Sequence, residues 1–119
     1  MANTLGTPEV KRGNNQFQGL FTDMWVVKIP VSDQDAIADD VSVDLTATVP
    51  GVVLGDIVLF IGADKSQSDA NAGITLNAWV TSDNTVTVRL TNIDATTDAY
   101  DADTLTGGNI KLVLGRPAW

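Results

Sequence analysis

Carboxylates are almost the only side chains in this sequence that could carry out acid–base or metal chemistry. Its 119 residues include 14 Asp, one Glu, seven Lys and Arg, and no His or Cys, and the net charge is −8. Asp98, Asp101 and Asp103 follow one another at spacings of three and two, and calcium takes oxygen ligands from acidic loops of this kind. The loop lacks the Asp-x-Asp-x-Asp-Gly run and the final Glu of an EF-hand. These residues are therefore candidate metal ligands, although a solvated acidic loop is the simpler interpretation.

The residue types that are missing exclude most catalytic arrangements. Without His or Cys, Ser-His and Cys-His nucleophile pairs cannot form, and the most common general base is absent. Two carboxylates could hydrolyse a glycosidic bond, but no pair can be singled out from the sequence. Gly107-Gly108 lacks the Lys and the following helix of a phosphate-binding loop. We therefore expect neither an enzyme nor a bound cofactor.

The charge is divided unevenly along the chain. Residues 1–22 carry two basic groups and one acidic group, a net of +1, whereas residues 23–119 carry 14 Asp against five Lys and Arg, a net of −9. An acidic body repels nucleic acid and anionic membranes, so neither is expected as a partner. No apolar segment is long enough for a membrane helix, and the N-terminus lacks the pattern of a signal peptide. We therefore expect a product that is made and kept in a cytoplasm unless something else carries it out.

Alternation of apolar and polar residues predicts six or seven strands and no long amphipathic helix. The clearest pattern is a hairpin in which two alternating segments flank the turn Ser82-Asp83-Asn84. The expected strands are 23–30, 41–49, 57–62, 73–81, 85–92 and 109–114. We therefore predict a single-domain, all-β protein: an antiparallel β-sandwich or small barrel, jelly-roll-like, over residues 23–119, with an extended N-terminal arm over residues 1–22.

The segment from Pro50 to Ile61 is expected to be the centre of this domain. Pro50-Gly51 is a type II turn signal, because Gly accepts the positive φ that the second corner needs. The uninterrupted apolar run Ile57–Ile61 predicts a strand that is covered on both faces. Asp56 opens this strand, so its carboxylate should either accept backbone N–H groups of the turn or pair with Arg89.

The three tryptophans have different expected environments. Trp25 alternates with apolar residues, and we expect it in the core. Trp79 points away from the apolar face of its strand, so it is either core on a second side or an anchor at an interface. Trp119 follows Pro117 at the last position, and we expect it to contact a neighbouring subunit.

Three segments of the chain resemble a family of small tailed-phage virion proteins. They are Val-Pro-Gly and Leu-Gly-Asp within residues 49–59, the strand 73–80, and Asp-Asn-Thr-Val-Thr-Val-Arg-Leu-Thr-Asn at residues 83–92. Members of this family are called head decoration, cement or head fibre proteins, and the resemblance covers residues 41–114. It implies a structural virion protein on the capsid exterior, with the major capsid protein and other copies of itself as partners. A homotrimer is the first expectation and a dimer the second.

The N-terminal arm is the segment expected to attach this protein to the capsid. Its composition is polar and aperiodic, which is typical either of a loose terminus or of a segment that orders on another chain. The residues expected at a capsid or subunit interface are Lys11, Arg12, Phe17, Leu20, Phe21 and Trp119.

An alternative is a binding module for host attachment, as in a tail or head fibre adhesin. Such a module would recognise carbohydrate, or would depend on calcium. It predicts that Trp79, Tyr100 and the loop from Asp98 to Asp103 are exposed together.

Overall fold

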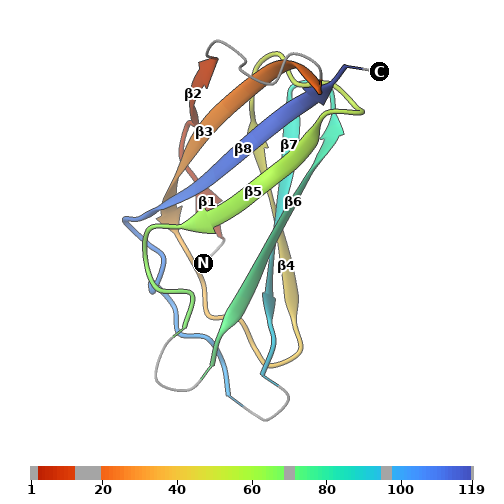
Figure 1. Ribbon diagram of the computed structural model, residues 1–119. Helices are drawn as coiled ribbons and strands as arrows, with labels where there is room; N and C mark the ends of the chain where they lie inside the picture. Colours follow the sequence, from red (N-terminus) through yellow and green to blue (C-terminus); the bar gives the residue numbers. More distant parts are fainter. Residues whose placement is uncertain (1–2, 13–19, 69–71, 95–97, 119) are drawn as a thin grey trace.

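The part of the chain described by the computed structural model folds into eight antiparallel strands and contains no helix (Figure 1). The described residues are 3–12, 20–68, 72–94 and 98–118. None of them forms a helix that could cross a membrane. The strands are β1 (Thr4–Leu5), β2 (Glu9–Arg12), β3 (Phe21–Asp33), β4 (Ser42–Thr48), β5 (Ile57–Ala63), β6 (Ile74–Ser82), β7 (Thr85–Asn92) and β8 (Asn109–Pro117).

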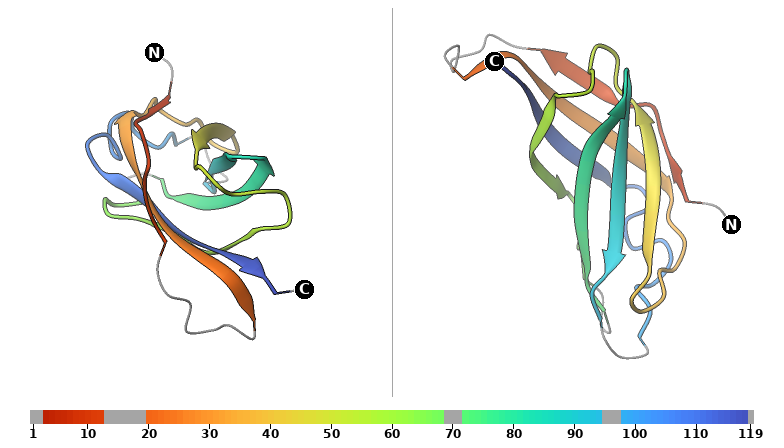
Figure 2. Two further views of the ribbon diagram at one scale, coloured as in Figure 1. Left: turned by 90° about the horizontal axis from the view of Figure 1, so that it is seen from above. Right: turned by 90° about the vertical axis from the view of Figure 1, so that its right-hand side faces the viewer.

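Two sheets pack face to face and define a β-sandwich (Figure 2). The larger sheet has the order β1-β3-β8-β5, with β2 also paired to β3, and the smaller sheet has the order β4-β7-β6. β8 pairs with both β3 and β5 in the larger sheet, and β7 pairs with both β4 and β6 in the smaller one, so the chain changes sheet repeatedly between β3 and β8. The predicted fold class is confirmed, and all six expected strands are present.

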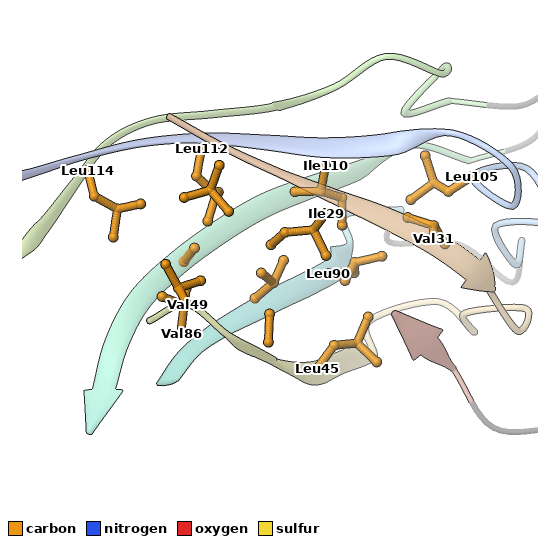
Figure 3. Packing of buried hydrophobic residues seen from close by; sticks show 14 of the residues in the cluster. Ile29, Val31, Leu45, Val49, Val86, Leu90, Leu105, Ile110, Leu112 and Leu114 are labelled. Carbon is orange, nitrogen blue, oxygen red and sulfur yellow. The ribbon is translucent and has the colours of Figure 1, made fainter. Parts of the chain in front are cut away.

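Inward-facing residues of both sheets form one core (Figure 3). Along β3, the alternate residues Trp25, Val27 and Ile29 are fully buried, which confirms the expected place of Trp25. They belong to the same core cluster as the buried side chains of β7 in the opposite sheet, such as Val86 and Leu90. Burial of each side chain of this size stabilises the fold by about 1.5–3 kcal/mol. Burial of these alternating residues therefore stabilises the packing of the two sheets.

The prediction that Ile57–Ile61 is covered on both faces is wrong. This segment forms β5, which is the edge strand of the larger sheet and pairs only with β8 among the described strands. Ile57 is 46% exposed and Phe60 is 70% exposed. An apolar run shows that a strand is hydrophobic, but it does not show whether a second layer covers its outer side. Here the outer side of β5 has no such layer in the described chain.

The N-terminal residues pair with β3 over its part from Trp25 to Asp33. β1 aligns Leu5 with Val31, and β2 aligns residues 9–12 with residues 28–25. The chain then enters β3 at Phe21. The division into an arm (1–22) and a body (23–119) stays a prediction, but the described part of that arm belongs to the larger sheet.

The loop between β4 and β5 is fixed by the β6–β7 turn. Gly51 has φ +97°, as its predicted turn position requires, and its N–H donates to Oδ1 of Asn84 at 2.8 Å. Asn84 itself has φ +61° and exchanges backbone hydrogen bonds with Val49 and Val52. The two loops therefore support each other at the end of the sandwich where β5 begins.

Candidate interface on the outer face of the larger sheet

Outward-facing side chains of β3, β8 and β5 form two apolar rows across the larger sheet. In the first row, Val26 lies opposite Val113, which lies opposite Phe60. The second row joins Met24, Gly115 and Ile57. These residues alternate with the buried ones of the same strands, so they point away from the core. We call this surface the outer face. Val26 is 54% exposed, and Phe60 is more exposed still.

An apolar groove occupies the end of the outer face where β3 begins. It is lined by Leu20, Phe21, Met24, Leu59 and Phe60. Leu59 is the extra residue of a β-bulge, since Val58 and Phe60 pair with adjacent residues of β8. Leu20 is 62% exposed at the rim. A groove with this lining presents hydrocarbon to solvent, and exposed apolar surface of this kind marks interaction sites.

The ring of Phe21 lies directly over Gly115. A Cβ atom built on Gly115 would be 2.6 Å from Cδ1 of Phe21, which is closer than carbon atoms can approach. Glycine at this position therefore lets the ring lie flat on β8 and form one wall of the apolar groove.

A second groove, next to the apolar one along β3, is basic. Its lining includes Lys11 from β2, Lys28 and Val26 from β3, and Lys111 from β8. Lys28 and Lys111 lie directly opposite each other, an arrangement that is unfavourable for like charges. Glu9 also lines this groove and pairs with Lys28, at 3.7 Å between Oε2 and Nζ. Three of the four lysines of the chain meet here. We call it the lysine groove.

The structure brings together part of the interface set expected from the sequence. Lys11 lines the lysine groove, and Leu20 and Phe21 line the apolar groove. Arg12 is the last residue of β2. Phe17 and Trp119 lie outside the described residues. Three of the six residues expected at an interface, Lys11, Leu20 and Phe21, thus lie along one face of the larger sheet.

Several residues of the outer face were not anticipated as interface residues. For β3 the alternation of residues in the sequence indicates them. Met24, Val26 and Lys28 alternate with the core residues of this strand and therefore share its other side. The members contributed by the other strands are Ile57, Leu59, Phe60, Lys111 and Val113.

The three candidate metal ligands do not form a cluster. Asp98, Asp101 and Asp103 are all exposed, and no three acidic side chains among the described residues lie close enough together to hold a metal ion. Instead, Asp103 accepts a hydrogen bond from Thr106 at 2.9 Å. The buried Gln34 holds this loop by donating to the backbone oxygen of Asp101 at 3.1 Å.

The joint exposure of aromatic residues and acidic loop is also not found. Tyr100 is fully buried, and its hydroxyl donates to the backbone oxygen of Ser66 at 2.7 Å. Trp79 is half-buried on the outer side of the smaller sheet, beneath Arg89, whose Cζ is 4.9 Å from the centre of the ring. The adhesin alternative required these groups to be exposed together, so this prediction is wrong for Tyr100.

Asp56 is buried, as expected, but its cationic partner differs from the predicted one. Its carboxylate accepts the N–H of Val53 at 2.9 Å, which confirms the expected contact with the turn. The predicted pair with Arg89 is wrong, because Arg116 binds Asp56 and Arg89 binds Asp44. Asp44 and Arg89 lie directly opposite each other on β4 and β7, so Arg89 has a nearer carboxylate.

Comparison with known proteins gives no further assignment. No family model, no curated protein and no solved structure matches this chain. The class that the fold and the site define is a small antiparallel β-sandwich that presents an apolar and basic sheet face. Any function must be argued from that face and from the sequence.

Proposed function

We propose that this protein is a structural virion protein that binds the exterior of a phage capsid and stabilises it. Its proposed partners are the major capsid protein and other copies of this chain, arranged as a homotrimer. The resemblance of residues 41–114 to head decoration proteins motivates the proposal. It also agrees with a sequence that lacks the residue types of most catalytic sites.

The observation that carries the proposal is the concentration of exposed apolar side chains on and beside the outer face. Eight large apolar residues are exposed among the described ones. Four of them lie on the outer face or line its apolar groove: Leu20, Val26, Ile57 and Phe60. Isolated exposed apolar residues are common, but a contiguous patch marks a surface that binds a partner. A flat sheet face with a groove suits a broad protein surface better than it suits a small molecule.

The geometry also fits the way a decoration protein works. A patch formed by a few strands gives a modest affinity for one contact. On a capsid the same contact is repeated over many sites, and linkage between neighbouring copies raises the effective affinity by about 10²–10⁴-fold without new contacts. The apolar groove is the proposed point of attachment, because it contains Leu20 and Phe21 of the segment expected to grip the shell.

The first test is mass spectrometry of purified phage particles, with the copy number of this chain per head. Hundreds of copies per head are expected for a decoration protein. A handful of copies would indicate a tail or fibre component, and complete absence from the particles would refute a virion role.

A second test uses matched variants on the same particles. Phe60→Ser should abolish attachment to the capsid, because it removes the most exposed side chain that lines the apolar groove. Ile93→Ser is the control, since Ile93 is 60% exposed but lies outside the groove. Equal attachment of the two variants would show that the groove is not the contact.

A further inference from the structure

The charge distribution points to a specific contact between two copies of this chain, and this inference goes beyond attachment to a capsid. We propose that the lysine groove binds the acidic end of a second copy, so that the copies associate head to tail. The acidic end is formed by residues 33–40 and 98–103. These two segments contain seven Asp and no Lys or Arg.

The acidic end is a single structural unit. Ile37 and Tyr100 exchange backbone hydrogen bonds at 3.0 and 2.8 Å, and the N–H of Asp103 donates to the backbone oxygen of Gln34 at 2.8 Å. In Figure 1 both segments lie at the lower end of the sandwich, beyond the end of β3. Their aspartates are therefore presented by one hydrogen-bonded pair of loops.

The lysine groove is not neutralised by the acidic end of its own chain. Lys28 and Asp33 are five residues apart on the same extended strand, which places their backbones about 16 Å apart. At physiological ionic strength, exposed charges are screened beyond about 8 Å. Asp64 lies close enough to Lys111 to be influenced by its charge, but its oxygens accept hydrogen bonds from Asn109 at 2.6 and 2.8 Å.

The sign of the charges also determines the symmetry of the contact. Two lysine grooves facing each other would bring six lysines together, and two acidic ends facing each other would bring many carboxylates together. Each arrangement is repulsive. Only a groove facing an acidic end is attractive, and a contact between two different surfaces is heterologous. Such contacts produce closed rings or open chains.

Sedimentation velocity of the purified full-length protein tests this inference without any capsid. The wild-type protein should associate as its concentration rises from micromolar to millimolar in low salt, and it should dissociate in about 1 M salt. The variant Lys28→Glu/Lys111→Glu should weaken this association by about tenfold or more. Asp98→Lys/Asp101→Lys should weaken it to a similar degree.

An equimolar mixture of the two double variants gives the sharpest result. Each variant alone has one intact surface and one reversed surface, so the mixture offers the wild-type contact between different molecules, and association should return. Lys65→Glu is the control, because Lys65 lies outside the groove and its reversal changes the net charge by the same amount as each single reversal within the groove. Thermal unfolding of each variant verifies that it is folded.

Three results would overturn the inference. They are a wild-type protein that is monomeric at every concentration, a groove variant that associates as well as the wild type, and a mixture that fails to associate. A monomeric protein whose groove variant no longer binds capsids would place the groove against the shell. The proposed decoration function would then stand without the head-to-tail contact.

Discussion

Asp56 and Arg116, 60 positions apart in the sequence, form a bidentate ion pair. Nε of Arg116 donates to Oδ1 of Asp56 at 2.8 Å, and Nη2 donates to Oδ2 at 3.0 Å. Nη2 also donates to the backbone oxygen of Gly51 at 2.9 Å, and Cζ lies 5.1 Å from the centre of the Trp25 ring. Hydrogen bonding to Asp56 is the main reason why the pKa of Arg116 is raised. The ion pair links the loop before β5 to the end of β8. It therefore stabilises the position of β5, the edge strand of the larger sheet.

Removal of this carboxylate should destabilise the protein. Asp56→Ala leaves the partly buried guanidinium with only the longer contact to Asp23, at 3.6 Å between Nη1 and Oδ2. It also removes the acceptor of the Val53 N–H, and the two losses should lower the free energy of unfolding by about 2–3 kcal/mol. Asp39→Ala in the acidic end should cost much less, because a loop carboxylate is solvated. Urea denaturation measures both variants, and equal losses would contradict the role given to Asp56.

The close contact of Phe21 with Gly115 predicts a coupled pair of substitutions. Gly115→Ala should cost about 1–3 kcal/mol, because the new methyl group displaces the ring. In a Phe21→Ala background the same change should cost little, since the ring is no longer there. A double-mutant cycle from denaturation curves measures this coupling. An identical cost in both backgrounds would mean that the ring does not lie over Gly115.

The turn residue Asn84 combines a backbone conformation and a side-chain contact that two substitutions can separate. Asn84→Gly keeps the positive φ easily but loses the hydrogen bond to Gly51, at a cost of about 0.5–1.5 kcal/mol. Asn84→Ala loses the same hydrogen bond and adds about 1–2 kcal/mol for a left-handed conformation. The Ala variant should therefore melt at a lower temperature than the Gly variant, and the reverse order would contradict this account.

Two surface carboxylates should titrate at unusually low pH. The pKa of Asp44 is lowered chiefly by its hydrogen bonds to Arg89, and the pKa of Asp64 is lowered by its hydrogen bonds to Asn109. A pKa that is lower in the folded state stabilises the protein above the unfolded value, near 3.9 for Asp. That stabilisation is lost as the pH falls through the folded value.

Carboxyl-carbon NMR titration measures these two pKa values directly. Arg89→Met should return the pKa of Asp44 toward its ordinary value and leave that of Asp64 unchanged. If both groups titrate normally in the wild-type protein, the hydrogen bonds of these carboxylates do not persist in solution.

The sandwich was predictable because its strands alternate in sequence as they do in space. β4 and β7 each carry one apolar and one polar side, so their extent and their inward faces follow from the residue pattern. β1 and β2 were not anticipated, because short strands with few apolar residues carry no periodic signal. They are fixed instead by the backbone of β3.

The partners of charged and aromatic residues were harder to infer. Arg89 and Arg116 are equally plausible partners for Asp56 in the sequence, and only the order of strands brings Arg116 to it. Tyr100 lies in an acidic segment, and the adhesin alternative predicts it at the surface. Its side chain is instead fully buried, and its hydroxyl donates to the backbone oxygen of Ser66. Such pairings depend on contacts between distant segments, which local patterns do not encode.

The pairing of β1 and β2 with β3 has a consequence for how the chain avoids unwanted association. An uncovered β3 would offer a row of unsatisfied backbone N–H and C=O groups, which is a template for adding a strand from another molecule. The N-terminal residues cover that row within the same chain. A partner that pulled them away would have to supply a strand in exchange, and proteolytic loss of this segment would create a molecule prone to edge-to-edge stacking. The N-terminal segment therefore prevents strands of other molecules from pairing with this edge of β3 for as long as it stays in place.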